Sequence, residues 1–483
     1  MSLMRLKSMQ SVLSQAEGGA HGLKRTLGAK DLMALGIGAI IGAGLFVRTA
    51  AAAGEASGAA VTLSFIVAAI GCAFAGLCYA EFAAMIPISG SAYAYAYVTM
   101  GELIAWIIGW ALVLEYALGA ATVAIAWSEY LNKLLEGAIP YQWCHSPWDT
   151  PSLVGNVHGI MNVPAIVILA LLTCVLVKGT KESALLNSII VLVKVAIVVL
   201  FIVIGWGFIN PANHTPYMIP EGTEGHEGFF QHGWGGVMRG SAIVFFAFIG
   251  FDAVSTAAQE AKRPERDMPI GILGSLAICT VLYILFGHVL TGVANYTEFK
   301  AAGKEASVAY AITTYMTGYG WLAKTVTVAI LAGFSSVILV MLMGQSRVFF
   351  SMSKDGLLPK VFSDLHPSFR TPYKSNLILF VFVGLFAGFI PGSVAGDLTS
   401  FGTLLAFVLV CAGVMILRAK SPELARPFKT PLVPLTPILG IIVCGAMIAA
   451  IDLETLKVAF GWMLLGLLIY FCYSRRHSNL TLR

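Results

Sequence analysis

The sequence predicts an all-α protein that crosses a membrane many times. Of its 483 residues, 58% are hydrophobic and only 11% are charged, whereas about 25% are charged in an ordinary soluble domain. A soluble protein with this composition would have too few polar side chains to cover its surface. In addition, apolar segments of about 20 residues, the length that crosses a bilayer, recur along the whole chain. The composition and the recurrence together predict a polytopic membrane protein.

Twelve segments have the composition and length of transmembrane helices. They lie near residues 31–50, 58–86, 101–134, 163–178, 187–209, 237–258, 269–293, 321–352, 375–391, 397–417, 432–452 and 457–474. This assignment predicts an N-terminal tail (1–30), a first five-helix repeat (31–209), a second five-helix repeat (237–417), two accessory helices (432–474) and a C-terminal tail (475–483).

The distribution of basic residues predicts that both termini lie in the cytoplasm. With that orientation, 21 lysines and arginines lie on the cytoplasmic side and 7 on the opposite side, which agrees with the positive-inside rule. The first 30 residues are polar and basic and lack the apolar core of a signal peptide. We therefore expect a multi-pass protein of the cell membrane, which is the inner membrane if the source is bacterial.

The sequence disfavours several classes of function. The net charge of +5 follows from the topology and does not indicate binding to nucleic acid. The eight cysteines include no C-x-x-C pair, so neither a disulfide framework nor a zinc site is expected. No span or loop pairs a nucleophile with a base. We therefore predict a protein that is not an enzyme and that holds no cofactor or metal.

Glycines interrupt two of the predicted spans near their middle. The first span contains Gly38, Gly42 and Gly44, and the sixth contains Gly250. A glycine inside a helix costs about 1 kcal/mol, so glycines at matching places in two spans indicate local unwinding. Paired interruptions of this kind point to a transporter's binding site. In the first span alone, Gly38-x-x-x-Gly42 can instead be a helix-packing motif.

The position of the interruptions also predicts internal symmetry. The first and sixth spans are five spans apart, and five is an odd number, so two five-helix halves would have opposite orientations in the membrane. We therefore expect an inverted repeat of spans 1–5 and 6–10, to which spans 11 and 12 are added.

An unwound helix exposes backbone groups that suit an amino acid. The start of one half-helix presents N–H groups with partial positive charge, and the end of the other presents carbonyl groups with partial negative charge. The carboxylate and the ammonium of a free amino acid match these two sets of groups. The main chain would thus recognise what all amino acids share, and side chains around the site would select among them.

Ionisable and hydroxyl side chains within the spans supply further candidates, because a charge at this depth costs at least about 3 kcal/mol. Lys194 is either a switch that gains and loses a proton or a fixed charge on the carbonyl groups of an unwound helix. Glu115 attracts a cationic substrate, carries a proton, or stays neutral and hydrogen-bonded. Asp252 caps the half-helix that follows the sixth-span interruption or joins a proton path. Ser335 and Ser336 bond to their own helix or coordinate sodium.

Several motifs resemble those of the amino acid–polyamine–organocation superfamily, and within it the cationic amino acid transporter family and its bacterial proton-coupled relatives. The resemblance covers roughly residues 23–470, although the animal cationic transporters have fourteen spans and twelve are predicted here. The motifs are Leu27–Gly38 followed by Ile41-Gly42-Ala43-Gly44, Phe248–Asp252 followed by Glu260–Ile272, Arg347–Pro359, and Phe369-Arg370-Thr371-Pro372.

The resemblance implies the leucine-transporter-like inverted-repeat fold, with an amino acid held by the main chain of the first and sixth spans around Gly250. It implies that Ala43 and Gly44 donate N–H groups to the substrate carboxylate, with Gly42 close by. The carbonyl groups of Ile40, Phe246 and Ile249 would accept hydrogen bonds from the ammonium. The aromatic ring of Phe246 would cover the substrate as a gate.

The same resemblance assigns the ionisable groups. Glu115 would face the substrate side chain, and Lys194 would take the place of sodium, as in proton-coupled relatives. Asp252 stands where exchangers place an acidic residue that is linked to coupling.

We therefore predict a secondary active transporter of L-amino acids that uses the proton as its coupling ion. Arginine, lysine or ornithine is favoured as the substrate over small neutral amino acids such as alanine. An obligatory amino acid exchanger and a substrate-sensing receptor on the same fold are the alternatives. Membrane lipid is an expected partner, and the sequence leaves open whether a small auxiliary subunit binds.

Overall fold

The computed structural model describes residues 5–8, 27–86, 91–152, 156–179, 184–301, 307–369 and 371–480. Most of the predicted N-terminal tail (1–30) lies outside the described residues. The same holds for six of the basic residues used to predict the orientation, which are Lys24, Arg25, Lys181, Lys304, Arg370 and Arg483.

The regular elements of the described chain are all helices, apart from one isolated β-bridge between Leu27 and Ala261. In its first half, spans 1 and 3 are each built from several segments, and the other spans are single helices. The helices of the first half are α2 (Ala29–Ile40), α3 (Thr49–Ala52), α4 (Val61–Met85), α5 (Ser91–Thr99), α6 (Glu102–Val113), α7 (Gly119–Leu134), α8 (Val163–Lys178) and α9 (Ala184–Gly205).

The second half contains the longest helices of the molecule and one short interrupted pair in span 6. Its helices are α10 (Gly233–Val244), α11 (Ala253–Thr256), α12 (Pro264–Val293), α13 (Tyr296–Ala301), α14 (Ser307–Tyr315), α15 (Gly320–Lys354), α16 (Tyr373–Phe389), α17 (Gly392–Lys420), α18 (Leu435–Ala449), α19 (Leu453–Ile469) and α20 (Arg475–His477).

Sequence signals at several helix starts explain where these elements begin. The Asn162 side chain accepts from the Ala165 N–H at the start of α8, and a proline stands in the first turn. The Asp452 side chain accepts from the N–H groups of Glu454 and Thr455 at the start of α19. Both are N-caps, which satisfy donors that a helix leaves unbonded in its first turn.

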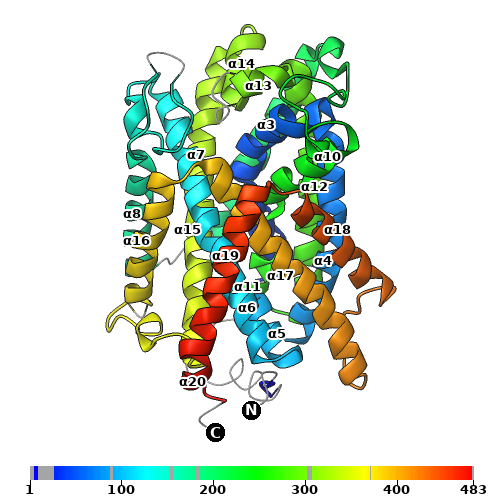
Figure 1. The fold of residues 1–483 in the computed structure, drawn as a ribbon, viewed down its shortest axis with the longest axis vertical. Helices are drawn as coiled ribbons and strands as arrows, with labels where there is room; N and C mark the ends of the chain where they lie inside the picture. Colours follow the sequence, from blue (N-terminus) through cyan, green and yellow to red (C-terminus); the bar gives the residue numbers. More distant parts are fainter. Residues whose placement is uncertain are drawn as a thin grey trace.

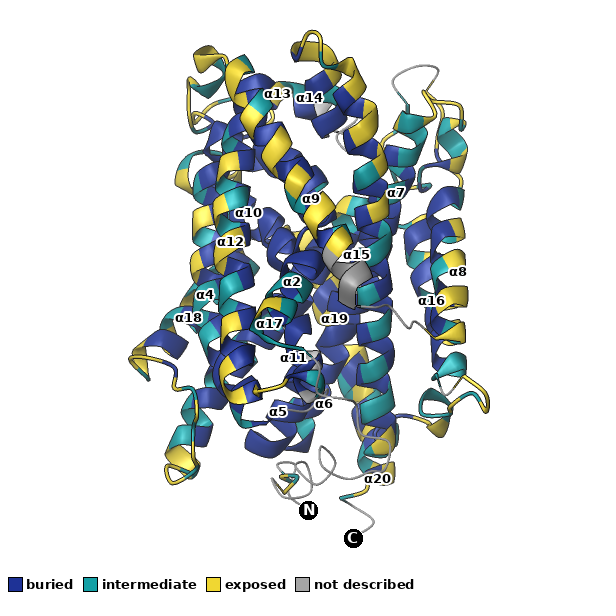
Figure 2. Ribbon diagram, turned by 180° about the vertical axis from the view of Figure 1, so that it is seen from behind, coloured by how far each residue is buried: buried dark blue, intermediate teal, exposed yellow. Residues whose placement is uncertain are grey.

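The long axis of the molecule separates two ends, which we call outer and inner (Figure 1). Helices α13 and α14 lie at the outer end, and α20 lies at the inner end. Helices α8 and α16 pack together at one side of the bundle, and α4, α12 and α18 lie at the other. Helix α9 crosses the back of the bundle, where it packs against α2, α12 and α15 (Figure 2).

The outward faces of the peripheral helices are apolar, as expected of a surface in contact with lipid. Examples are Leu192 on α9, Val281 on α12, Val381 on α16 and Leu468 on α19, each more than half exposed. Within the described chain, eight helices are long and apolar enough to cross a membrane, and three shorter apolar helices accompany them. The all-helical membrane class is thereby supported, while the count of twelve spans and the inverted repeat stay predictions.

Candidate functional site

The first predicted span is interrupted after Ile40, where the sequence placed its glycines. Helix α2 ends there, and Ile41 has an extended backbone with ψ of 104°. The chain resumes at Ala43 and continues as a π-helical turn, η1 (Gly44–Arg48). The Leu45 and Phe46 N–H groups both donate to the Gly42 carbonyl, at 3.2 and 3.4 Å. This span is therefore two half-helices joined by an irregular peptide.

The sixth predicted span is interrupted over a longer stretch. Helix α10 passes into a 3-10 turn, η9 (Phe245–Phe248), and the backbone is extended at Ile249 with ψ of 133°. Gly250 has a φ of +116°, a conformation that residues with a β-carbon rarely adopt. Helix α11 then begins at Ala253. The prediction of unwinding near Gly250 is thus matched by the backbone itself.

The two interruptions lie back to back in reciprocal contact. A β-carbon on Gly44 would overlap the Ala247 backbone, and one on Gly250 would lie 2.9 Å from the Ala39 carbonyl oxygen. Glycine is required at both places because the partner backbone occupies the space of a side chain. Close backbone packing therefore accompanies the unwinding at Gly44 and Gly250, while the helix-packing interpretation, which concerned Gly38 and Gly42, stays a prediction.

A tyrosine that the sequence analysis did not single out joins the two interruptions. The Tyr283 hydroxyl, on α12, lies 3.0 Å from the Ile40 carbonyl oxygen and 2.9 Å from that of Ala247. Because one hydroxyl hydrogen is shared by two acceptors, each carbonyl keeps capacity for another donor. The Phe246 carbonyl likewise accepts from the Ile249 N–H. Ser275, Thr280 and Thr291 lie in the same predicted span, so no sequence signal distinguished Tyr283 from the other hydroxyl groups there.

The remaining predicted contact groups of the substrate lie at the same level and are buried. Ala43 begins the second half-helix, and a β-carbon on Gly42 would lie 3.3 Å from Val337 of α15. The Phe246 and Ile249 side chains are 3% and 1% exposed. The structure therefore brings the predicted main-chain residues of both spans into one place.

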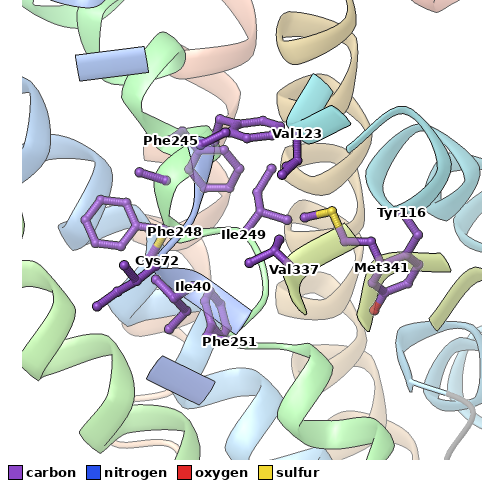
Figure 3. Close-up of a cluster of buried hydrophobic side chains, with 14 of the residues drawn as sticks. Ile40, Cys72, Tyr116, Val123, Phe245, Phe248, Ile249, Phe251, Val337 and Met341 are labelled. Atoms are coloured by element: carbon purple, nitrogen blue, oxygen red, sulfur yellow. The ribbon is translucent and has the colours of Figure 1, made fainter. Parts of the chain in front are cut away.

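Apolar side chains fill the space beside the interruptions (Figure 3). Ile249 lies in the centre of the cluster, with Val337 and Met341 of α15 on one side and Val123 of α7 close by. Phe248 packs against Phe65 of α4 and Tyr283 of α12, with ring centroids 6.2 and 5.2 Å apart. The surroundings of a bound side chain would thus be largely hydrophobic in this conformation.

Lys194 reaches the end of the first half-helix. Its Nζ donates to the Gly38 carbonyl oxygen at 2.8 Å, where the last turn of α2 carries partial negative charge. Its side chain packs on α15, where a β-carbon at Gly333 would lie 2.9 Å from Lys194 Cε. Among the described residues Lys194 forms no ion pair, so a single cation connects α9, α2 and α15.

Glu115 and Asp252 form a pair, which the sequence analysis did not anticipate. Glu115 lies in a π-helical turn of span 3, η4 (Leu114–Leu118), and both carboxyl groups are fully buried and interact with each other. Tyr116 donates to Asp252 at 2.9 Å. A π-helical turn often marks a functional position, but nothing in the local sequence distinguishes it from an α-helix.

The hydrogen bonds of Asp252 and of two serines on α15 bear on the alternatives that the sequence left open. Asp252 makes no capping hydrogen bond to α11, because its side chain turns toward Tyr116 and Glu115 instead; the capping interpretation was wrong. Ser335 donates to the Leu331 carbonyl and Ser336 to the Gly333 carbonyl, both at 2.9 Å within α15. These two serines are thus back-bonded to their own helix.

An ion cluster lies closer to the outer end than the interruptions do, and it joins η1, α10 and α17. Asp397 of α17 accepts from Arg48 of η1 and, at 2.6 Å, from Arg239 of α10. Arg48 and Asp397 are each 4% exposed. The sequence analysis counted both arginines only as outer charges. The sequence did offer a signal for their partner, because Asp397 is the first residue of the predicted span 397–417 and lies at its outer end.

Comparison with known proteins identifies the family. An amino acid permease model matches residues 27–472. The chain belongs to the amino acid permease family. Three relatives illustrate the range of names within it. A branched-chain amino acid permease of Bacillus subtilis is 42% identical over 99% of both chains. A methylthioribose transporter of the same organism is 40% identical over 99% of both. A vacuolar cationic amino acid transporter of Arabidopsis thaliana is 34% identical over 87% of this chain and 68% of its own length.

The family membership confirms several predictions and leaves others open. The resemblance stated from the motifs is confirmed, as is a role in transport rather than in enzyme catalysis, because the relatives are permeases and transporters. The family is that of amino acid permeases, and one relative matched over its whole length is named for methylthioribose. A preference for cationic substrates is not established, since one relative matched over its whole length is named for branched-chain amino acids.

Proposed function

We propose that this permease takes up an L-amino acid together with a proton. The observation that carries the proposal is the packing of two unwound segments against each other, with the Lys194 amino group bonded to the carbonyl of Gly38 beside them. The unwound segments supply main-chain donors and acceptors for the amino acid. The lysine supplies a site whose charge changes when a proton binds.

The coupling step uses the position of Lys194 between three helices. When charged, its Nζ holds α9 to the last turn of α2, and its methylene groups pack on α15 at Gly333. When neutral, the amine has a much weaker attraction to the carbonyl. Release of the proton therefore loosens α2 from α9 and favours the opposite-facing state. A fixed structural charge on the same carbonyl is the competing account of Lys194.

The geometry favours a neutral substrate with an apolar side chain. The side chains beside the interruptions are apolar, among them Val123, Ile249, Val337 and Met341, and such a surface gains free energy by contact with aliphatic carbon. A relative that aligns with this chain over 99% of its length is named as a branched-chain amino acid permease. Leucine, isoleucine and valine are the first substrates to test.

A cationic substrate is the second candidate, as the sequence alone favoured. The observation in its favour is the buried pair Glu115–Asp252, for which the described residues supply no ion-pair partner of opposite charge. An arginine or lysine side chain that reached this pair would supply that charge. Relatives named as cationic amino acid transporters support the same candidate.

The decisive experiment is uptake into proteoliposomes that contain no amino acid. We expect leucine to accumulate when the outside is more acidic than the inside, and to accumulate less when an ionophore removes the proton gradient. Net uptake into empty vesicles would exclude strict exchange. Thermal stabilisation by leucine without any uptake would favour a receptor and contradict the proposal.

A second arm separates the two substrate candidates. Arginine is added outside the same empty vesicles in place of leucine, and both uptakes are repeated with Glu115→Gln. Uptake of arginine that is lost in this variant while leucine uptake persists would support the cationic candidate. Uptake of leucine alone in both proteins would support the neutral one.

A further inference from the structure

A large cavity opens at the outer end and is separate from the interruptions. Its volume is about 690 Å³, enough for on the order of twenty water molecules at the density of the liquid. It is lined by residues of α7, α14 and α15 and by the segment that follows α7. Charged and titratable side chains of both signs surround it, namely Glu129, Lys133, Glu136, His145 and Lys324.

A second, narrow void lies around Lys194. It is lined by Ile41 and Phe46 of span 1, by Ile197 of α9 and by several residues of α15. The void leaves no room for a water molecule in this conformation. The Lys194 amino group is therefore dry in the structure, although a void adjoins it.

The two spaces lie along one face of α15. The outer cavity is lined by Ala323 and Thr327, and the inner void by Ile330 and Phe334. These residues are spaced four, three and four apart, which places them on one side of a helix. Thr327 and Ile330 are separated by about 4.5 Å along the helix axis. Less than one turn of α15 thus separates the outer cavity from the void at Lys194.

Three aromatic side chains meet at the void around Lys194, and two of them, Phe46 and Phe334, line it. Phe334 lies 6.1 Å from Phe46 and 5.7 Å from Tyr130, measured between ring centroids. The Tyr130 hydroxyl donates to the Phe46 carbonyl at 3.1 Å. Phe46 belongs to η1, the half-helix that follows the first interruption. We call these three residues the aromatic partition. It is connected to a segment that must move when the transporter changes its access.

We propose that the outer cavity is the mouth of a water path to Lys194 along α15, and that Phe46, Tyr130 and Phe334 close this path. Displacement of η1 moves Phe46 away from Phe334 and lets water enter the void. A proton then passes from that water to the Lys194 amine, and the outer solution resupplies it. The role of the path in proton coupling rests on the proposed function, but the access of water to Lys194 along α15 can be tested without it.

The groups that face Lys194 are compatible with such a path. Gly38 of α2 presents its carbonyl, and α15 presents the backbone of Gly333. Helix α12 contributes the thiol of Cys279, which is the titratable group that interacts with Lys194. The charged groups of the outer cavity lie beyond the aromatic partition. Water is thus the proton donor that the geometry allows to reach the amine from the outer side.

Thiol labelling tests the path directly and without reference to transport. Ile330→Cys is treated in intact cells with a membrane-impermeant methanethiosulfonate, and the peptide that contains residue 330 is quantified by mass, so that the native cysteines do not interfere. We expect slow modification, which becomes several-fold faster when Phe334→Ala is added. Phe382→Ala on α16, which packs against Phe386 and Trp462, is the matched control for loss of an aromatic ring.

A milder variant guards against misfolding. Tyr130→Phe removes only the hydroxyl that holds the Phe46 carbonyl, and it should also speed the modification of Ile330→Cys, though less than Phe334→Ala. An unchanged rate in both variants, or an equal increase with Phe382→Ala, would overturn the path.

Proton flux separates the path from the proposed function. We expect Phe334→Ala vesicles to admit protons without any amino acid, and Lys194→Met to suppress that leak. If Lys194→Met leaves acid-driven uptake intact in the otherwise unchanged protein, the proposed coupling fails while the labelling still decides the path. If labelling does not respond but Lys194→Met abolishes coupling, the path fails and the proposed function stands.

Discussion

Two groups of buried charged side chains, one at the outer level and one at the central level, differ in their surroundings. At the outer level, Asp397 lies between Arg48 and Arg239. At the central level, Lys194 faces a carbonyl group, and Glu115 faces the carboxyl group of Asp252. The outer cluster is compensated by opposite charge, whereas the central groups are not.

The difference in surroundings suggests two roles: the outer cluster holds helices together, whereas the central groups can bind and release protons. A carboxylate held by two guanidinium groups keeps its charge and fixes the helices that bear them. A lysine on a carbonyl or a carboxyl beside a carboxyl changes its interaction when a proton binds. The outer cluster is thus suited to hold η1, α10 and α17 together, and the central groups are suited to respond to protons and substrate.

The largest effect is expected from breaking the outer cluster. Asp397→Asn removes the carboxylate that the buried Arg48 and the partly buried Arg239 share, and removal of one partner from a buried ion pair costs about 3–5 kcal/mol. We expect a strong fall in the yield of monodisperse protein and in its thermal unfolding temperature. Lys457→Ala, which breaks the exposed pair with Glu454, is the control. Equal unfolding temperatures for both variants would show that the cluster contributes no cohesion.

The next effect is functional and concerns the central cation. Lys194→Ala should abolish accumulation driven by a proton gradient, because no group remains on α9 whose charge can hold α2. Substrate binding, measured by thermal stabilisation, should persist, since the interruptions of spans 1 and 6 are intact. Accumulation that follows the proton gradient unchanged in this variant would assign Lys194 a fixed structural role.

A smaller effect is expected from the acidic pair. Glu115→Gln and Asp252→Asn each remove one of two neighbouring carboxyl groups, so the double variant should differ from the sum of the single ones. Coupling of directly interacting residues is about 0.5–3 kcal/mol. The measurement is a double-mutant cycle on uptake at several pH values. Strict additivity would mean that the two groups act independently.

The smallest effect should follow from Tyr283→Phe, which removes one shared hydroxyl. A net hydrogen bond is worth about 1 kcal/mol, so we expect a change of only a few-fold in apparent substrate affinity. The unfolding temperature should fall little, because the ring still packs against Phe65 and Phe248. A loss of transport as complete as that from Lys194→Ala would show that this hydroxyl contacts the substrate or the proton.

The sequence was sufficient where the physical cause is local. Glycines at Gly44 and Gly250 predicted where helices unwind, because only the backbone at those positions determines the outcome. A contact of Lys194 with the carbonyl groups of an unwound helix was one of two alternatives that the sequence left open, and the Gly38 carbonyl is the acceptor. Apolar segment lengths likewise predicted the helical membrane class.

What the sequence could not predict depends on long-range packing. The pairing of Glu115 with Asp252 joins residues from spans 3 and 6, and no local pattern indicates it. Tyr283 is one hydroxyl among several in apolar spans until the helices are placed. The capping role expected for Asp252 was wrong because a distant tyrosine competes for the same carboxylate.

The reciprocal contact of the two interruptions has a consequence for motion. Ala39 abuts Gly250, and Ala247 abuts Gly44. At the inner ends the main chains are hydrogen-bonded, because the Leu27 N–H donates to the Glu260 carbonyl and the Lys262 N–H donates to the Leu27 carbonyl. Spans 1 and 6 are therefore fastened to each other along their length and must travel as one body. Sliding of either past the other would drive backbone into backbone, so access can alternate only by tilting this joined pair within the surrounding helices.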